Sequence, residues 1–121
     1  MAKRILVVDD DTVMLEFVTN TLKPHGYEVT CAQGGTEAIH KLREDSFDGV
    51  ILDFFMPEKD GLDVVGDMFK RRDKTPVVVL SSNLDPHYEA AVQGFGITRE
   101  VLRKPCAPEM LLQTMERVLN G

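Results

Sequence analysis

The segment "ILVVDDD" at residues 5–11 decides the fold, because four apolar residues run directly into three acidic ones. A short apolar run of this kind is typical of a strand buried on both faces, and the charges mark where that strand meets water. A second segment, "GVILDFFMP" at residues 49–57, has the same form and places Asp53 at its end. The two segments predict a parallel sheet with carboxylates at one edge.

Short runs rich in β-branched residues alternate with longer segments of helical periodicity along the whole chain. This alternation is typical of βαβ units, in which helices cover both faces of a parallel sheet. The sequence therefore predicts a three-layer α/β fold with five strands, at Arg4–Val8, Glu28–Cys31, Gly49–Leu52, Pro76–Leu80 and Glu100–Arg103.

Five helices are expected between and after these strands. Asp60 and Asp85–Pro86 are suited to helix starts, as an N-cap and as an N-cap with proline in the first turn, and Pro108 is suited to the first turn of the last helix. The residues expected to face the core are Leu15, Val18 and Leu22; Ala38, Ile39 and Leu42; Leu62, Val65 and Phe69; and Leu111, Met115, Val118 and Leu119.

Length and composition indicate one compact unit. At 121 residues, with 43% hydrophobic and 28% charged residues, the chain can bury a core without disulfides. No linker or change of composition interrupts it, so residues 1–121 are expected to form a single domain without an output domain. A membrane helix or signal peptide is not predicted, and a cytoplasmic location is expected.

Several charged and reactive residues are interpreted as ordinary surface or packing residues. The net charge of −6 argues against nucleic-acid binding by this domain. The basic cluster Arg71, Arg72 and Lys74 is interpreted as a solvated helix end. His25, His40 and His87 lack the spacing of a metal site, and Cys31 and Cys106 are expected to be free thiols.

Three acids are expected to converge at the carboxyl edge of the sheet, where open α/β sheets bind their ligands. Asp9 and Asp10 follow the first strand, and Asp53 follows the third. Like charges about 4 Å apart repel by roughly 4 kcal/mol near a protein surface, so such a cluster would take up a proton or a cation. A site of oxygen ligands with room for water and a phosphate is what Mg²⁺ prefers, so this cation is expected here. Asp11 is interpreted as an N-cap of the first helix rather than a metal ligand.

A hydroxyl and an ammonium group are predicted at the same edge. Ser81 follows the fourth strand, and Lys104 follows the fifth. Acids, a divalent cation, a lysine and a hydroxyl are the groups that bind and stabilise a phosphoryl group. Ser82 is interpreted as a small residue that leaves the crevice open, since no base accompanies it.

The whole chain resembles the receiver (CheY-like) domain of bacterial two-component response regulators. The resemblance rests on "VVDDD" at 7–11, "ILDFFMPEKDG" at 51–61, "VVVLSS" at 77–82 and "LRKP" at 102–105. It implies a flavodoxin-like (βα)5 fold whose parallel sheet has the order 2-1-3-4-5.

The resemblance also implies a role for each site residue. Asp53 would be the phosphoacceptor, and Asp9, Asp10, Asp53 and the backbone carbonyl of Phe55 would bind Mg²⁺. Lys104 would pair with the acceptor carboxylate and then with phosphoryl oxygens, and Ser81 would follow the phosphoryl group with its hydroxyl. A cis bond is implied between Lys104 and Pro105.

The implied partners are a sensor histidine kinase or phosphotransfer protein and a downstream protein that reads the phosphorylated state. The reading surface would lie around the fourth helix, fifth strand and fifth helix, and a phosphorylation-dependent homodimer is left open. Such a domain is not a conventional enzyme, since it catalyses its own phosphorylation and dephosphorylation.

The chain differs from the family pattern at several positions. Val101 stands where the family commonly has Tyr or Phe, and Cys106 stands where Phe often follows Lys-Pro. The segment before the fifth strand is about one residue longer than the common pattern. Phe55 and Asn83 would flank the path of the attacking water, and a bulky Phe55 would slow hydrolysis.

Two other functions are weighed against the first. Val101 motivates a non-phosphorylated pseudo-receiver that acts only as a protein interaction module. A Mg²⁺-dependent phosphohydrolase of the haloacid dehalogenase kind also uses an Asp at a strand end. That group needs a second acid two residues later, where this chain has Phe55, so turnover of small phosphate esters is not expected.

Overall fold

The computed structural model describes residues 2–82 and 85–120. Five parallel strands form one sheet in the order β2-β1-β3-β4-β5, as the resemblance implied. The elements in chain order are β1 (Arg4–Val8), α1 (Thr12–Leu22), a short 3-10 helix η1 (Lys23–His25), β2 (Glu28–Ala32), α2 (Gly35–Glu44), β3 (Gly49–Leu52), α3 (Gly61–Lys70), β4 (Val77–Ser81), α4 (Pro86–Gln93), β5 (Thr98–Arg103) and α5 (Pro108–Asn120).

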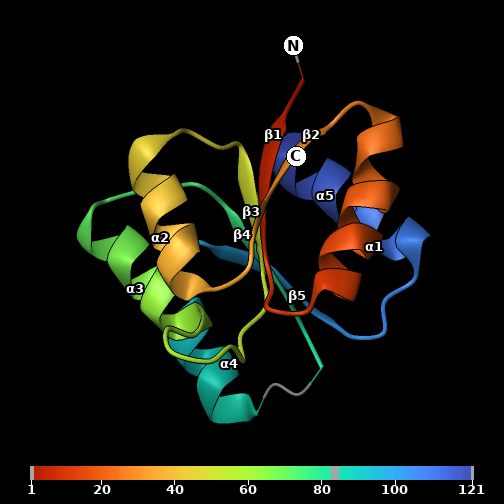
Figure 1. Cartoon of the computed structure of the whole chain (residues 1–121). Coiled ribbons are helices and arrows are strands. Elements are labelled where there is room, and N and C mark those ends of the chain that lie inside the picture. The colour runs from red at the N-terminus through yellow and green to blue at the C-terminus, as the bar shows by residue number, and fades with distance from the viewer. Residues whose placement is uncertain (1, 83–84, 121) are drawn as a thin grey trace.

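The molecule has three layers, with the sheet between two groups of helices (Figure 1). Helices α1 and α5 contact each other on one face, and α2, α3 and α4 line the other. The predicted three-layer α/β fold is therefore confirmed.

Alternate residues of the central strands supply the two cores. Ile5 and Val7 of β1 pack toward α1 and α5, whereas Leu6 and Val8 belong to the core beneath α2, α3 and α4. All four side chains are at most 2% exposed. Burial of both sets explains why this strand is a continuous apolar run.

The helix starts follow the predicted capping pattern. Asp11, Asp60 and Asp85 each accept a hydrogen bond from a backbone N–H in the first turn of α1, α3 and α4. Asp60 and Asp63 form a reciprocal capping box. The interpretation of Asp11 as an N-cap is confirmed.

The fifth strand is longer than predicted and contains an irregularity. It begins at Thr98 rather than Glu100, and its pairing with β4 shifts between Val77, opposite Thr98, and Val78, opposite Glu100. Arg99 is the extra residue, so the strand accommodates it as a bulge. The predicted bounds of β2 and β4 differ from the observed ones by one residue.

The predicted core face of α3 is wrong at Phe69, which is 56% exposed. The face that packs on the sheet is instead formed by Gly61, Val64, Val65 and Met68. These positions repeat with the spacing of one helical stripe, and Phe69 lies one residue, about 100°, around the helix from Met68. Phe69 therefore points away from the core.

Other surface predictions are confirmed. The three histidines and the cluster of Arg71, Arg72 and Lys74 are exposed, and Cys31 and Cys106 are free cysteines. Among the described residues, no helix is both long and apolar enough to cross a bilayer.

Candidate phosphoacceptor site

Sheet pairing brings the first two acids together. Strands β1 and β3 are neighbours, with Val8 opposite Leu52, so Asp9 and Asp53 leave the sheet side by side. The backbone N–H of Asp53 donates to the carbonyl of Val8 at 2.9 Å, which fixes this arrangement past the strand ends.

Asp9, Asp10 and Asp53 form an acidic cluster. Each residue offers one carboxylate oxygen, and the three oxygens lie within 4.8 Å of one another. Asp9 is 4% exposed and Asp53 is 6% exposed, whereas Asp10 lies at the solvent side. The predicted convergence of the three acids is confirmed.

Lys104 and Ser81 complete the site. The Lys104 ammonium lies 2.8 Å from Oδ2 of Asp9 and 3.7 Å from Oδ2 of Asp53. The Ser81 hydroxyl donates to Oδ1 of Asp53 at 3.2 Å. A backbone bond from the Lys104 N–H to the Ser81 carbonyl, at 3.0 Å, holds the two residues at neighbouring strand ends. The lysine thus contacts both carboxylates, with Asp9 the closer, and the predicted pairing with Asp53 is the longer contact.

Burial changes the acidity of the central carboxyl. Desolvation, followed by the charge of Asp9, raises the pKa of Asp53 from 3.8 to about 6. The Lys104 ammonium and hydrogen bonds from the Ser81 hydroxyl and the Phe54 backbone oppose the shift. A buried acid with a raised pKa in a charged pocket is typical of a functional site.

A close contact with α3 holds the loop that follows Asp53. The Gly61 N–H donates to the Phe54 carbonyl at 3.0 Å. A Cβ at position 61 would lie 2.4 Å from a ring carbon of Phe54, so only glycine permits this approach. This packing holds the backbone of the segment that runs from Asp53 to the capping box at the start of α3.

The loop after β1 is held in a similar way. The backbone N–H of Asp11 donates to Oδ1 of Asp9 at 2.9 Å, while the Asp11 carboxylate caps α1. Asp9 therefore has one oxygen bound by the backbone and the other by Lys104. The bond between Lys104 and Pro105 is cis, as the resemblance implied.

An aromatic cluster borders the site, and sequence reasoning missed one of its members. The ring of Tyr88, in the first turn of α4, lies 5.7 Å from Phe54 and 5.4 Å from Phe55, both edge-to-face. Phe55 is 42% exposed. Asn83, the other residue predicted to flank the water path, lies outside the described residues.

Val101, within β5, and Cys106, just after it, are the two residues that differ from the family pattern, and they pack on opposite faces of the sheet. Val101 is half-buried against the core beneath α2, α3 and α4. Cys106 is half-buried against the core beneath α1 and α5, and burial raises the pKa of its thiol.

Comparison with known proteins shows the family to which this fold and this cluster of side chains belong. The chain belongs to the response regulator receiver domain family, which matches it over residues 5–116. It is 38% identical over 120 residues to the response regulator MprA of Mycolicibacterium vanbaalenii and 36% identical to MprA of Mycobacterium tuberculosis. Each match covers 99% of this chain and 52% of the relative, so the chain spans about half the length of these proteins.

Solved structures give the same result. The chemotaxis protein CheY4 of Vibrio cholerae is 35% identical with a TM-score of 0.89, over 98% of this chain and 100% of that one. The response regulator TrrA of Thermotoga maritima, solved in complex with Mg²⁺ and beryllofluoride, is 31% identical with a TM-score of 0.85, over 97% and 99%. The chain is therefore a receiver domain of the two-component type, the predicted family.

The residues present fit the cation that this family binds at its acidic pocket. Three carboxylates converge with their oxygens close together, and oxygen ligands are what Mg²⁺ selects. In octahedral coordination at about 2.1 Å, neighbouring ligand oxygens lie about 3 Å apart, so the three carboxylates, whose oxygens lie within 4.8 Å of one another, would have to move closer together to hold the ion.

Proposed function

We propose that this domain accepts a phosphoryl group on Asp53 from a phosphohistidine of a sensor histidine kinase or phosphotransfer protein. The observation that carries the proposal is the buried Asp53 carboxylate, which contacts both Ser81 and Lys104 and lies within the acidic cluster. Residues 1–121 would act as one receiver unit.

Asp53 is the nucleophile in this proposal. One carboxylate oxygen attacks phosphorus, an O–P bond forms, and the P–N bond to the donor imidazole breaks with its electron pair leaving on nitrogen. The reactive form is the carboxylate, and a pKa of about 6 leaves Asp53 largely ionised at pH 7.5.

Asp9, Asp10 and Asp53, with the Phe55 backbone carbonyl, would hold Mg²⁺. The bound ion would neutralise the charge on these acids and on the phosphoryl oxygens. Asp9 is already oriented for such a role, because the Asp11 N–H fixes one of its oxygens.

Lys104 and Ser81 would respond to the phosphoryl group. The ammonium of Lys104, between Asp9 and Asp53, is placed to pair with phosphoryl oxygens. The Ser81 hydroxyl would exchange its bond to Asp53 for one to a phosphoryl oxygen. This exchange would bias the surface around α4, β5 and α5 toward a downstream protein or a phosphorylation-dependent homodimer.

Beryllofluoride, a phosphoryl mimic, tests the proposal. Amide NMR spectra of the wild-type chain with Mg²⁺ and beryllofluoride should change at Ser81, Lys104 and residues of α4 and β5. Asp53→Asn, which cannot form the adduct, should show no such change, and Glu16→Gln on the exposed face of α1 is the matched control. Unchanged wild-type spectra would contradict the proposal.

The pseudo-receiver is the second candidate, favoured by Val101 at the position of the family's aromatic residue. The complete set of acids, Ser81 and Lys104 supports the phosphorylated form instead. Partner binding that Asp53→Asn leaves intact, with no phosphoryl adduct on the wild type, would favour the pseudo-receiver.

A further inference from the structure

A second surface lies at the edge of the sheet opposite Asp53, where α3 ends and β5 begins. It surrounds a cavity of about 820 Å³. We call it the α3–β5 patch and define it by two aromatic and four basic residues among those that line the cavity: Phe69, Phe95, Lys70, Arg72, Lys74 and Arg99.

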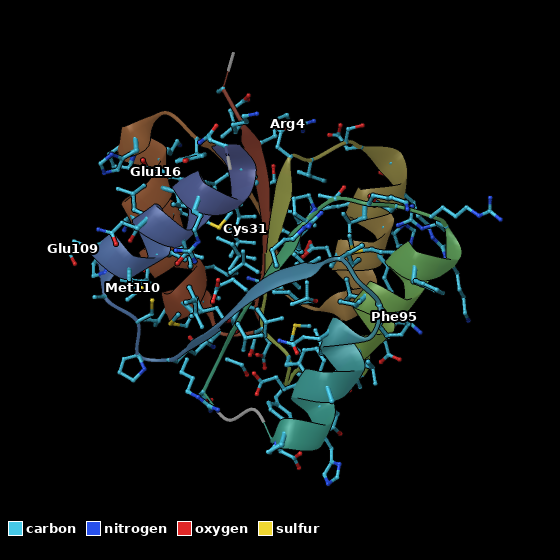
Figure 2. The ribbon with its side chains drawn as sticks, turned by 180° about the vertical axis from the view of Figure 1, so that it is seen from behind. Arg4, Cys31, Phe95, Glu109, Met110 and Glu116 are labelled. Atoms are coloured by element: carbon cyan, nitrogen blue, oxygen red, sulfur yellow. The ribbon has the colours of Figure 1, made fainter. Side chains whose placement is uncertain are left out.

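The apolar part of the α3–β5 patch is an aromatic pair, in which Phe69 is exposed and Phe95 is half-buried against the core beneath α2, α3 and α4. The rings of Phe69 and Phe95 lie 5.2 Å apart between centroids, and Phe69 is 56% exposed. Figure 2 shows Phe95 beside the ribbons of α3 and α4. An exposed ring that packs against a half-buried one at the border of a cavity is the kind of anchor point that protein interfaces use.

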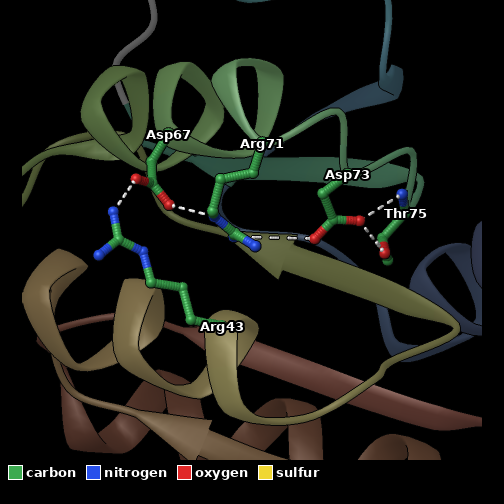
Figure 3. A network of polar contacts seen from close by, with 5 residues as sticks. All are labelled: Arg43, Asp67, Arg71, Asp73 and Thr75. Atoms are coloured by element: carbon green, nitrogen blue, oxygen red, sulfur yellow. Dashed lines mark hydrogen bonds and ion pairs between the residues drawn. The ribbon is translucent and has the colours of Figure 1, made fainter.

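The rim of the patch carries uncompensated positive charge. Within residues 2–82 and 85–120, none of its four basic side chains makes an ion pair. The adjacent acids are engaged elsewhere, as Figure 3 shows: Asp67 pairs with Arg43 and Arg71, and Asp73 accepts from the Thr75 hydroxyl at 2.6 Å and lies 3.9 Å from Arg71. The two carboxylates of this network are balanced by its two guanidinium groups, so they do not neutralise the four basic side chains of the rim.

The bulge in β5 contributes one of the four basic residues. Arg99 is the residue without a partner in the pairing of β4 and β5, and it is exposed. Bulges commonly redirect a side chain. The extra residue before the regular part of β5 thus supplies a guanidinium at the rim of the cavity.

We propose that the α3–β5 patch docks an acidic protein segment that inserts an aromatic or large apolar side chain against Phe69 and Phe95. The rim charge complements carboxylates, and an apolar centre with a polar rim is the usual anatomy of a protein interface. A long nucleic acid is disfavoured, because the chain as a whole carries a net charge of −6 and would repel a polyanion beyond the patch.

This docking is independent of phosphorylation at Asp53. The patch and Asp53 lie at opposite ends of strands of about five residues, which span about 17 Å. A partner held at the patch leaves the carboxyl edge open to the phosphodonor. The surface would therefore tether a partner in both states of the domain.

Fluorescence anisotropy with a labelled peptide, rich in Asp and Glu around a central Phe, tests the proposal. The wild-type chain should bind this peptide more tightly than the same peptide with Gln and Asn in place of its acids. Lys70→Glu with Lys74→Glu should weaken binding by about tenfold or more, and Phe69→Ala should also weaken it. Lys3→Glu with Lys23→Glu makes the same net charge change away from the patch and should have a much smaller effect.

Thermal melting would verify that each variant is folded, and the NMR response of Lys70→Glu/Lys74→Glu to beryllofluoride should remain that of the wild type. Peptide affinity should be the same with and without Mg²⁺ and beryllofluoride. Absence of peptide binding, equal losses in both double variants, equal binding of the neutral peptide, or tighter binding of duplex DNA than of the acidic peptide would overturn the proposal.

Discussion

Replacing Asp53 by Asn should stabilise the fold at neutral pH when no divalent cation is present. In the folded state the carboxyl is 6% exposed and its pKa is about 6, against an ordinary value of 3.8. Between these two pH values the folded chain binds more protons than the unfolded chain, so the free energy of unfolding falls as the pH rises from about 4 to 6. A difference of about two pH units corresponds to about 3 kcal/mol.

That amount already includes the opposing effects of the Lys104 ammonium and the Ser81 hydroxyl on the pKa. The offset that remains is the buried side-chain NH2 of Asn, which would face the Lys104 ammonium in place of Oδ2 and costs about 1 kcal/mol. The Lys104 ammonium favours the charged carboxylate at 3.7 Å, and it can turn fully to Asp9 in the variant. Asn retains an oxygen that accepts from the Ser81 hydroxyl. We therefore expect Asp53→Asn to raise the free energy of unfolding by about 2 kcal/mol at pH 7.5, and by almost nothing at pH 4.

Urea unfolding of the wild type and variant at both pH values, in EDTA, measures this difference. Glu16→Gln removes one negative charge from an exposed site and should leave the unfolding midpoint nearly unchanged. Added Mg²⁺ should stabilise the wild type more than the variant, because the ion binds the folded carboxylates. A variant that is no more stable than the wild type at pH 7.5, or a gain of equal size at pH 4, would refute the reasoning.

Three further substitutions test other parts of the account. Phe55→Asn should speed hydrolysis of the phosphorylated chain by about tenfold, because it removes an exposed ring beside the site, and an unchanged lifetime of the phosphorylated form would contradict this role. Gly61→Ala should destabilise the fold by about 1–3 kcal/mol in urea, since its Cβ would meet the Phe54 ring, and full stability would show that the loop is not held there. Thr114→Val should stabilise the fold by about 1 kcal/mol, because the buried Oγ1 of Thr114 has no hydrogen-bond partner among the described residues, and a lower unfolding midpoint would reveal a bond at that hydroxyl.

The sequence predicted the elements best where an apolar run ends in a charge. The bounds of β1 and β3 are correct because both strands are buried on both faces and are followed at once by Asp9 and Asp53. The start of β5 was missed because an edge strand with alternating polar residues resembles a loop, and its bulge depends on how β4 pairs with it.

Helix rotation was less predictable than helix existence. In α3, the residues at 62, 65 and 69 and those at 61, 64, 65 and 68 both have helical spacing. The close approach of Gly61 to Phe54 selects the second stripe and leaves Phe69 outside. That contact joins two segments and has no local sequence signal.

At the site, the sequence identified the groups but not all their contacts. The five side chains at 9, 10, 53, 81 and 104 were placed together because parallel strands end at one edge. The closer contact of Lys104 with Asp9, and the packing of Tyr88 on Phe54 and Phe55, depend on side-chain conformation and on how α4 lies over the loop.

The phosphoacceptor role of Asp53 is tested most directly by the intact mass of the chain after incubation with phosphoramidate, with Mg²⁺ or with EDTA. We expect the wild type to gain one phosphoryl group only when Mg²⁺ is present, with peptide mapping to Asp53, and the Asp53→Asn variant to gain none. A wild-type chain that stays unmodified with Mg²⁺, or an adduct that forms equally in the variant, would contradict the account.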